Sequence, residues 1–329
     1  MKYAIVAWVI SAVVLTLALW LHLLPALLAG LLSYELVHLI GPRLTRSQKG
    51  GGKLAAVALI AVAVVAILTL VVFGAVAFLR SDMGSLPHLL QRLAEIVEGS
   101  RGHLPEWLFG AMPGDAESLK AAIIAWLRLH AQELRTLGGE LGHVVAYSLI
   151  GMVIGALVAL REAEEVQEGG PLDRELRERA SRLAESFRRV VFAQIRISAL
   201  NTVFTAAYLL AILPLFGVHL PLAKTLVAVT FVTGLLPVAG NLISNTVVVL
   251  VSLGVSLPVA IASLAFLVVI HKLEYFLNAR IVGRQIRANA WELLLAMLAM
   301  EAAFGIPGLV AAPIYYAYLK DELSARGLV

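Results

Sequence analysis

Two short breaks in long apolar runs contain the residue types that could bind a solute inside this chain. The first break interrupts the run 222–253, and its members are Gly234, Pro237, Gly240, Asn241, Ser244 and Asn245. An interrupted helix frees N–H groups and carbonyl oxygens, and a half-helix N-terminus carries a partial positive charge. Such groups can hold hydroxyls or cations without a charged side chain. The break is therefore a candidate binding site for a small polar solute.

The second break interrupts the run 291–319 and consists of Gly305, Pro307 and Gly308. Two interrupted helices that enter a membrane from opposite faces are typical of a transport site near the bilayer midplane. Asn201, in the apolar segment 191–213, adds a further polar group to this candidate substrate site. An alternative interpretation is that the glycines and prolines only permit close packing of helices.

Ion coupling needs an ionisable group inside the membrane, where acidic residues are rare and commonly functional. Glu301, shortly before the second break, and Glu274 are the candidate coupling residues. Glu35 lies nearer an interface, where a solvated or salt-bridged role is simpler. Arg196 either extends toward the interface or faces an anionic ligand. No residue spacing predicts a metal site, a nucleotide site or a catalytic set, so we expect neither a cofactor nor an enzyme.

The composition predicts a polytopic membrane protein. The chain is 60% hydrophobic and 15% charged, with a mean hydropathy of +0.89, whereas soluble domains are about 25% charged. A net charge of +4 does not indicate nucleic-acid binding here, because basic cytoplasmic loops are usual in membrane proteins. The chain has no cysteine, which excludes disulfides and thiol chemistry.

The N-terminal residues 1–79 are expected to form three spans of a scaffold. Residues 3–20 and 24–40 predict a hairpin that turns near His22 and Pro25, with a signal peptide as the alternative. The loop 41–53 carries four basic residues and no acid, which places it and the N-terminus in the cytoplasm. A third span follows to Leu79.

Two charged segments flank the fourth predicted span. Residues 80–142 have helical periodicity and a slight acidic excess, so they predict amphipathic helices on the external surface. The span 143–160 contains Gly151 and Gly155, a GxxxG pattern that allows close helix contact. Residues 161–190 are rich in arginine and predict an amphipathic helix on the cytoplasmic surface.

Residues 191–329 are expected to form the transport core. As single helices, the runs 222–253 and 291–319 would be about 48 and 43 Å long, whereas the hydrocarbon core is about 30 Å thick. Helical hairpins that return to their own side explain this length and keep the basic loop 272–289 and the C-terminus cytoplasmic. Proline-kinked single spans are the alternative. The predicted fold is an all-α polytopic protein of the plasma (inner) membrane, with about six full spans and two broken hairpins.

Four short motifs follow one another in the C-terminal half of the chain. These are Leu236–Gly240, Val269–Glu274, Ile281–Gly283 and Phe304–Pro313. In their order and spacing, residues 185–323 resemble the autoinducer-2 exporter family of permease-like membrane proteins. The layout before them also agrees with the family. Asn241 stands where the family usually has proline.

The resemblance implies a secondary transporter that exports a small polar solute, similar to the autoinducer-2 signal, by alternating access. An elevator-like motion and coupling to protons are left open. It also implies a homo-oligomer, specifically a pentamer. One alternative is a sodium (or lithium)/proton antiporter, since the family includes proposed antiporters, and another is a non-transporting membrane scaffold. The lipid bilayer and a small solute, with H⁺ or Na⁺ as the coupling ion, are the expected partners.

Overall fold

The computed structural model is helical wherever it describes the chain, and no strand occurs among these residues, which confirms the all-α prediction. The described residues are 2–44, 51–80, 131–163, 169–235, 239–281 and 290–328. Most of the predicted external segment 80–142 lies outside them.

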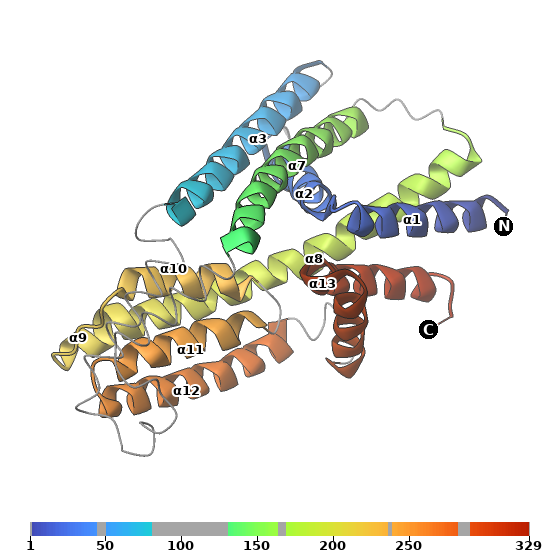
Figure 1. Cartoon of the computed structure of the whole chain (residues 1–329). Coiled ribbons are helices and arrows are strands. Elements are labelled where there is room, and N and C mark those ends of the chain that lie inside the picture. Colours follow the sequence, from blue (N-terminus) through green and yellow to red (C-terminus); the bar gives the residue numbers. More distant parts are fainter. Residues whose placement is uncertain are drawn as a thin grey trace. The chain divides into compact units, whose positions relative to one another are not determined.

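The helices follow one another as α1 (Lys2–Trp20), α2 (Leu24–Leu44), α3 (Gly51–Arg80), α7 (Ala131–Ala163), α8 (Pro171–Ala207), a π-helical turn (Tyr208–Ile212), α9 (Leu213–Leu215), α10 (Ala223–Gly234), α11 (Ala239–Leu253), α12 (Leu257–Ile281) and α13 (Ala290–Ser324) (Figure 1). Six of the described helices are long and apolar enough to span a membrane. They are Lys2–Trp20, Leu24–Gly41, Leu54–Gly74, Gly142–Glu162, Pro171–Leu215 and Trp291–Ser324.

Two features of these helices concern their length. One continuous helix runs from Pro171 to Leu215. It includes residues 171–190 of the predicted surface helix and the whole of the predicted span 191–213. Its interior contains no glycine and its next proline is Pro214, so nothing in the backbone ends it earlier. The apolar part of α12, Leu257–Lys272, is shorter than a full span.

The chain divides into two compact units, which are described separately. Unit 1 comprises Met1–Gly74, Gly138–Phe192 and Ile286–Val329. Unit 2 comprises Ala75–Leu137 and Ala193–Gln285. Helix α8 contributes its N-terminal part to unit 1 and its C-terminal part to unit 2.

The turn between α1 and α2 is fixed by His22, which has a positive φ of 57°. The Leu23 N–H donates to the Ala18 carbonyl at 2.8 Å, and the His22 N–H donates to the Leu19 carbonyl at 3.1 Å. This pair of bonds is the Schellman ending of a helix, in which the residue after the cap adopts the left-handed conformation. The predicted hairpin turn near His22 is thereby confirmed.

Helix α2 is the central element of unit 1. On one side Val37 packs with residues of α3 and α7, among them Ile60 and Ala156. On another side Leu28 packs against Phe187 of α8 and also joins the cluster formed by α1 and α13. Apolar residues on the outer faces of α3 remain exposed, such as Leu59 at 71% and Leu70 at 72%, as expected for a lipid-facing surface.

Helices α2 and α7 pack against each other through small residues. A Cβ atom on Gly151 would overlap the carbonyl oxygen of Ala26, and one on Gly155 would overlap that of Gly30. The GxxxG pattern of α7 therefore meets a small-xxx-small pattern of α2, Ala26 and Gly30. This close approach of two backbones is the arrangement that small residues permit between membrane helices.

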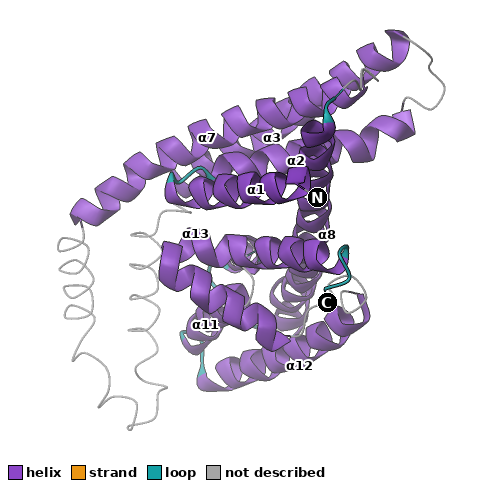
Figure 2. Cartoon of the chain, turned by 90° about the vertical axis from the view of Figure 1, so that its right-hand side faces the viewer, coloured by secondary structure: helices purple, strands orange, loops and turns teal. Residues whose placement is uncertain are grey.

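Helix α13 folds back on itself at Gly305, where φ is 64° and ψ is −147°. Glu292 accepts hydrogen bonds from the Tyr316 hydroxyl at 2.6 Å and from Lys320 Nζ at 2.8 Å. Residues this far apart along one straight helix could not touch. Figure 2 shows the two halves as separate helical segments joined at a sharp bend. The predicted break is confirmed, and the kinked single span is excluded for this run.

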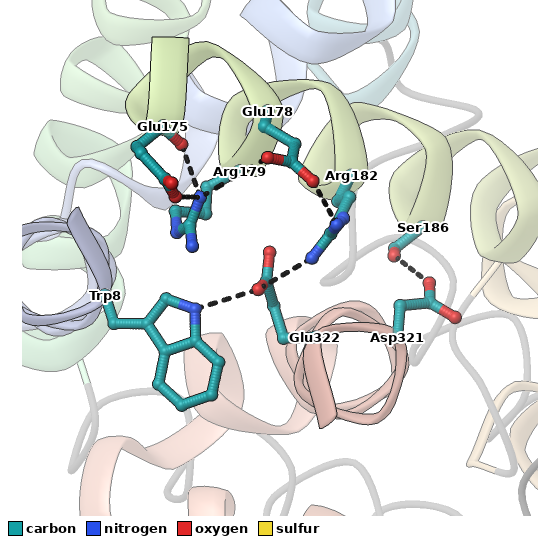
Figure 3. A network of polar contacts seen from close by, with 8 residues as sticks. All are labelled: Trp8, Glu175, Glu178, Arg179, Arg182, Ser186, Asp321 and Glu322. Carbon is teal, nitrogen blue, oxygen red and sulfur yellow. Dashed lines mark hydrogen bonds and ion pairs between the residues drawn. The ribbon is translucent and has the colours of Figure 1, made fainter. Parts of the chain in front are cut away.

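A polar network joins α1, α8 and α13 in unit 1 (Figure 3). Glu322 Oε2 accepts a hydrogen bond from Trp8 Nε1 at 2.9 Å and one from Arg182 at 3.0 Å. Nearby, Asp321 accepts from Ser186 at 2.8 Å and pairs with Arg189. The N-terminal part of α8 is thus fixed to the end of α13 by ion pairs.

Candidate functional site

The candidate site described in most detail by the structure is the break between α10 and α11 in unit 2. Helix α10 ends at Gly234 and α11 begins at Ala239, while Pro237 lies outside the described residues. A Cβ atom on Gly240 would overlap the carbonyl oxygen of Thr233, so glycine is needed where the two helices approach. The run 222–253 is therefore two short helices in contact, as predicted.

Two carbonyl oxygens near the end of α10 are bound by side chains of α8. Gln194 Nε2 donates to the Gly234 carbonyl at 2.7 Å, and Ser198 Oγ donates to the Phe231 carbonyl at 2.7 Å. The last carbonyls of a helix have no partner within that helix. Helix α8 therefore holds the end of α10 in place by satisfying them.

The start of α11 is held by an amide pair. Asn201 Nδ2, on α8, donates to Asn241 Oδ1 at 3.1 Å, and the Asn201 side chain is only 5% exposed. Ser244 Oγ donates to the Asn241 carbonyl at 3.3 Å and is 1% exposed. Asn245, one turn after Asn241 in α11, is half-buried. Five of the predicted site residues thus line the same break: Asn201, Gly234, Gly240, Asn241 and Ser244.

The α8 residues of this site belong to a stripe that we call the polar column. Its members recur at alternating intervals of four and three and are Gln194, Ser198, Asn201, Thr205 and Tyr208. Positions at this spacing share one face of a helix. The Tyr208 hydroxyl lies 3.1 Å from Ser263 Oγ, which in turn lies 2.7 Å from Ser252 Oγ. A row of hydrogen-bonding groups therefore runs through the interior of unit 2.

The polar column ends in a π-helical turn. Within Tyr208–Ile212 the helix widens, and the Leu213 N–H donates to the Tyr208 carbonyl. Such turns occur frequently at functional sites. The Thr205 hydroxyl, one turn earlier, is buried without a hydrogen-bond partner among the described residues. Unsatisfied buried hydroxyls are uncommon, so this one offers a vacant bonding position to water or a solute.

All members of the polar column are uncharged at neutral pH. Arg196 lies on the other side of α8 and is exposed, which favours its outward-facing interpretation. Among the described residues, no group of three or more His, Cys, Asp or Glu side chains could hold a metal ion. The described part of the site can therefore donate and accept hydrogen bonds, but it supplies neither a formal charge nor a nucleophilic pair.

The second predicted break, Gly305, Pro307 and Gly308, belongs to unit 1. Gly308 is buried, and a Cβ atom there would overlap the carbonyl oxygen of Met300 across the bend. Glycine is thus required for close packing at this position. That the two breaks together form one site stays a prediction.

The two candidate coupling residues are less fully described. Glu301 is exposed on the first half of α13. Glu274 belongs to α12, but its side chain lies outside the described part of the structure. Their role in ion coupling stays a prediction.

Gln194 and Ser198 were not among the predicted site residues. The signal that could have identified them is the alternating spacing of polar residues along α8, which marks a single face. Trp8 and Glu322 were not among the predicted site residues either. Neither residue belongs to a motif, and only the folded chain brings them together.

The model of the family described as AI-2E family transporter matches residues 3–325, nearly the whole chain. No curated protein and no solved structure matches the chain.

Proposed function

The chain belongs to the AI-2E family of transporters, and from this we propose that it is a secondary transporter that exports a small polar solute by alternating access. The solute we propose is an uncharged molecule with several hydroxyls, similar to the autoinducer-2 signal. The multi-pass helical architecture supports a location in the membrane. We further propose the plasma membrane, cytoplasmic termini and a homo-oligomeric assembly.

One observation carries the proposal. A helix is broken inside a bundle, and the polar column of α8 lies against that break. Irregular backbone at membrane depth is tolerated only where protein covers it or a water-filled cavity adjoins it. Here Gln194 and Ser198 cover the freed carbonyls of α10, while Asn201 and Asn241 pair across the break. A solute hydroxyl could exchange with the Asn201–Asn241 bond at little cost.

Replacing Asn201 with alanine is expected to weaken export of autoinducer-2 from proteoliposomes. The substitution removes a buried donor and leaves Asn241 without that bond, which costs about 1–3 kcal/mol. We expect the apparent affinity to fall on the order of tenfold. Efflux of autoinducer-2 from preloaded liposomes, measured over a concentration series, checks this.

Thr202→Ala is the matched control for Asn201→Ala. Thr202 is the next residue of α8, and its hydroxyl donates to the Ser198 carbonyl of its own helix at 2.7 Å. Its loss is expected to leave efflux nearly unchanged. Equal effects of the two substitutions would contradict a role for the polar column. Sodium-dependent proton movement without solute efflux would instead support the antiporter alternative.

Replacing Glu301 with glutamine is expected to abolish the response of transport to a pH gradient. The change keeps the size of the side chain but removes the carboxylate that could carry a proton. We expect solute efflux from wild-type proteoliposomes to accelerate when a pH gradient is imposed, and efflux by the variant to be the same with and without it. An unchanged response in Glu301→Gln would exclude this residue from coupling.

A further inference from the structure

The ends of α2 and α7 meet in a cluster of titratable side chains that the proposed transport site does not use. His38 Nε2 lies 3.1 Å from Glu162 Oε2, and the Tyr34 hydroxyl donates to the same oxygen at 2.8 Å. His38 Nδ1 lies 3.1 Å from the carbonyl oxygen of Tyr34, one turn earlier in α2. The rings of Tyr34 and His38 are also in contact, with centroids 4.2 Å apart.

Both ring nitrogens of His38 thus face oxygen atoms that can only accept hydrogen bonds. A neutral imidazole carries a single N–H, so one of the two contacts would bring two lone pairs together. The imidazolium form carries two N–H groups and donates in both directions. Of the protonation states of His38, only the doubly protonated ring satisfies both contacts.

Further charged side chains lie in the same cluster. Besides Glu162, the cluster holds Glu35, which lies 3.7 Å from Arg188 of α8, and Glu185, which lies 3.9 Å from Arg188. Among the described side chains of this cluster, acidic groups outnumber basic ones by three to one, and a positive charge on His38 would reduce this excess. The described α3 residues that pack against Val37 of α2 include Val57, Ile60 and Val64, which are apolar, and Arg161 of α7 is exposed.

We propose that His38 is a proton-binding site that fastens α2 to α7. With its proton, the ring bridges the Tyr34 carbonyl and the Glu162 carboxylate. Without it, one of these contacts is lost and the attraction to Glu162 disappears. Histidine is the side chain that ordinarily changes charge between about pH 5 and 8. The contact that His38 makes between α2 and α7 is therefore strong at acidic pH and weakens as the pH rises. It involves α2, the helix around which unit 1 packs.

The site is accessible from outside the protein, because the His38 and Glu162 side chains are 41% and 38% exposed. This exposure also limits its strength, since solvent screens ion pairs. The proposal concerns the folding of unit 1 and does not depend on the solute transported. Its test can therefore fail while the proposed transport function holds, and the proposed transport function can fail while this proposal holds.

A double-mutant cycle tests the proposal on the purified full-length protein in detergent. Thermal unfolding midpoints of the wild type, His38→Gln, Glu162→Gln and the double variant are compared at about pH 5.5 and about pH 8. We expect the His38–Glu162 coupling to raise the midpoint by roughly 2 °C at the lower pH and to be clearly smaller at the higher pH. His143→Gln, an exposed histidine of α7, is the control and should show no coupling with Glu162→Gln.

A second measurement is made on the wild-type protein and uses a variant only to assign the His38 signal. Nitrogen-15 NMR of histidine-labelled wild-type protein reports the protonation of each ring, and His38→Gln identifies the signal. Two protonated ring nitrogens at about pH 5.5 support the proposal. A singly protonated His38 ring at that pH, or a coupling that is equal at both pH values, overturns it.

Discussion

Replacing Gly305 with alanine is expected to straighten α13 and to destabilise unit 1 by about 1–3 kcal/mol. Gly305 has a φ of 64° and a ψ of −147°, a region of backbone conformation that is populated almost only by glycine. No atom lies within 4 Å of a Cβ built at this position, so crowding does not contribute. The whole effect comes from the backbone.

The strained alanine has an alternative conformation, because α13 is helical on both sides of Gly305. A helical φ at this position would join the two halves into one extended helix, in which Pro307 and Pro313 would leave only kinks. Glu292 and Lys320, which are 2.8 Å apart at their charged atoms, would then be separated by about 42 Å along the axis. The ion pair and the Tyr316 hydrogen bond that close the hairpin would be lost together.

Spin labels on exposed sites of the two halves measure this change directly. The chain has no cysteine, so labels on Leu294→Cys and Leu319→Cys report only the intended pair. We expect a short separation in the otherwise unaltered protein, and a population near about 38 Å after Gly305→Ala. Gly74→Ala, an open position in α3, is the control and should not change the distance. A single short distance in the Gly305→Ala protein would contradict the backbone argument.

Glycine and proline explain why the two hairpins could be predicted. Gly305 and the Gly234–Gly240 segment interrupt runs that are too long for one span, and the run lengths follow from the sequence alone. The turn at His22 was equally accessible, because a polar residue lies between two apolar runs just before a proline. In each case a local backbone requirement is visible in the residue types.

Contacts that depend on the tertiary fold could not be predicted in this way. The continuity of α8 was missed because its charge changes sharply near Phe192, whereas helix formation depends on backbone and propensity rather than on polarity. The site itself was predicted in part. Asn241 and Asn201 were chosen for their polarity, but their pairing joins residues on different helices, and no periodicity within one helix encodes the partner.

The polar column also explains how the two sides of the break are held. Gln194, Ser198 and Asn201 share one face of α8, which has no break along this stretch. The broken helix carries the glycines, and the unbroken helix carries the groups that bind its freed carbonyls. A change in the hydrogen bonds between them could move α10 and α11 without unfolding α8.

Replacing Gly155 with isoleucine is expected to separate α2 from α7 and to destabilise unit 1 by about 3 kcal/mol. A Cβ atom at this position would overlap the carbonyl oxygen of Gly30 and approach its carbonyl carbon within 2.7 Å. These are backbone atoms, which cannot move aside as a flexible side chain can. Overpacking of a tight interface typically costs about 1–3 kcal/mol, and a backbone obstacle places this substitution at the upper end.

Thermal unfolding in detergent, with Gly142→Ile as the control, isolates the effect of packing. Gly142 belongs to the same helix, so both substitutions change the helix propensity in the same way. A Cβ atom built on Gly142 has no atom within 4 Å, so only Gly155→Ile also creates a steric overlap. We expect the midpoint of Gly155→Ile to fall well below that of Gly142→Ile. Equal midpoints would mean that α2 and α7 do not depend on small residues. The joint made by His38 and Glu162 lies further along these two helices, so a separation here would also remove its pH-dependent contribution to stability.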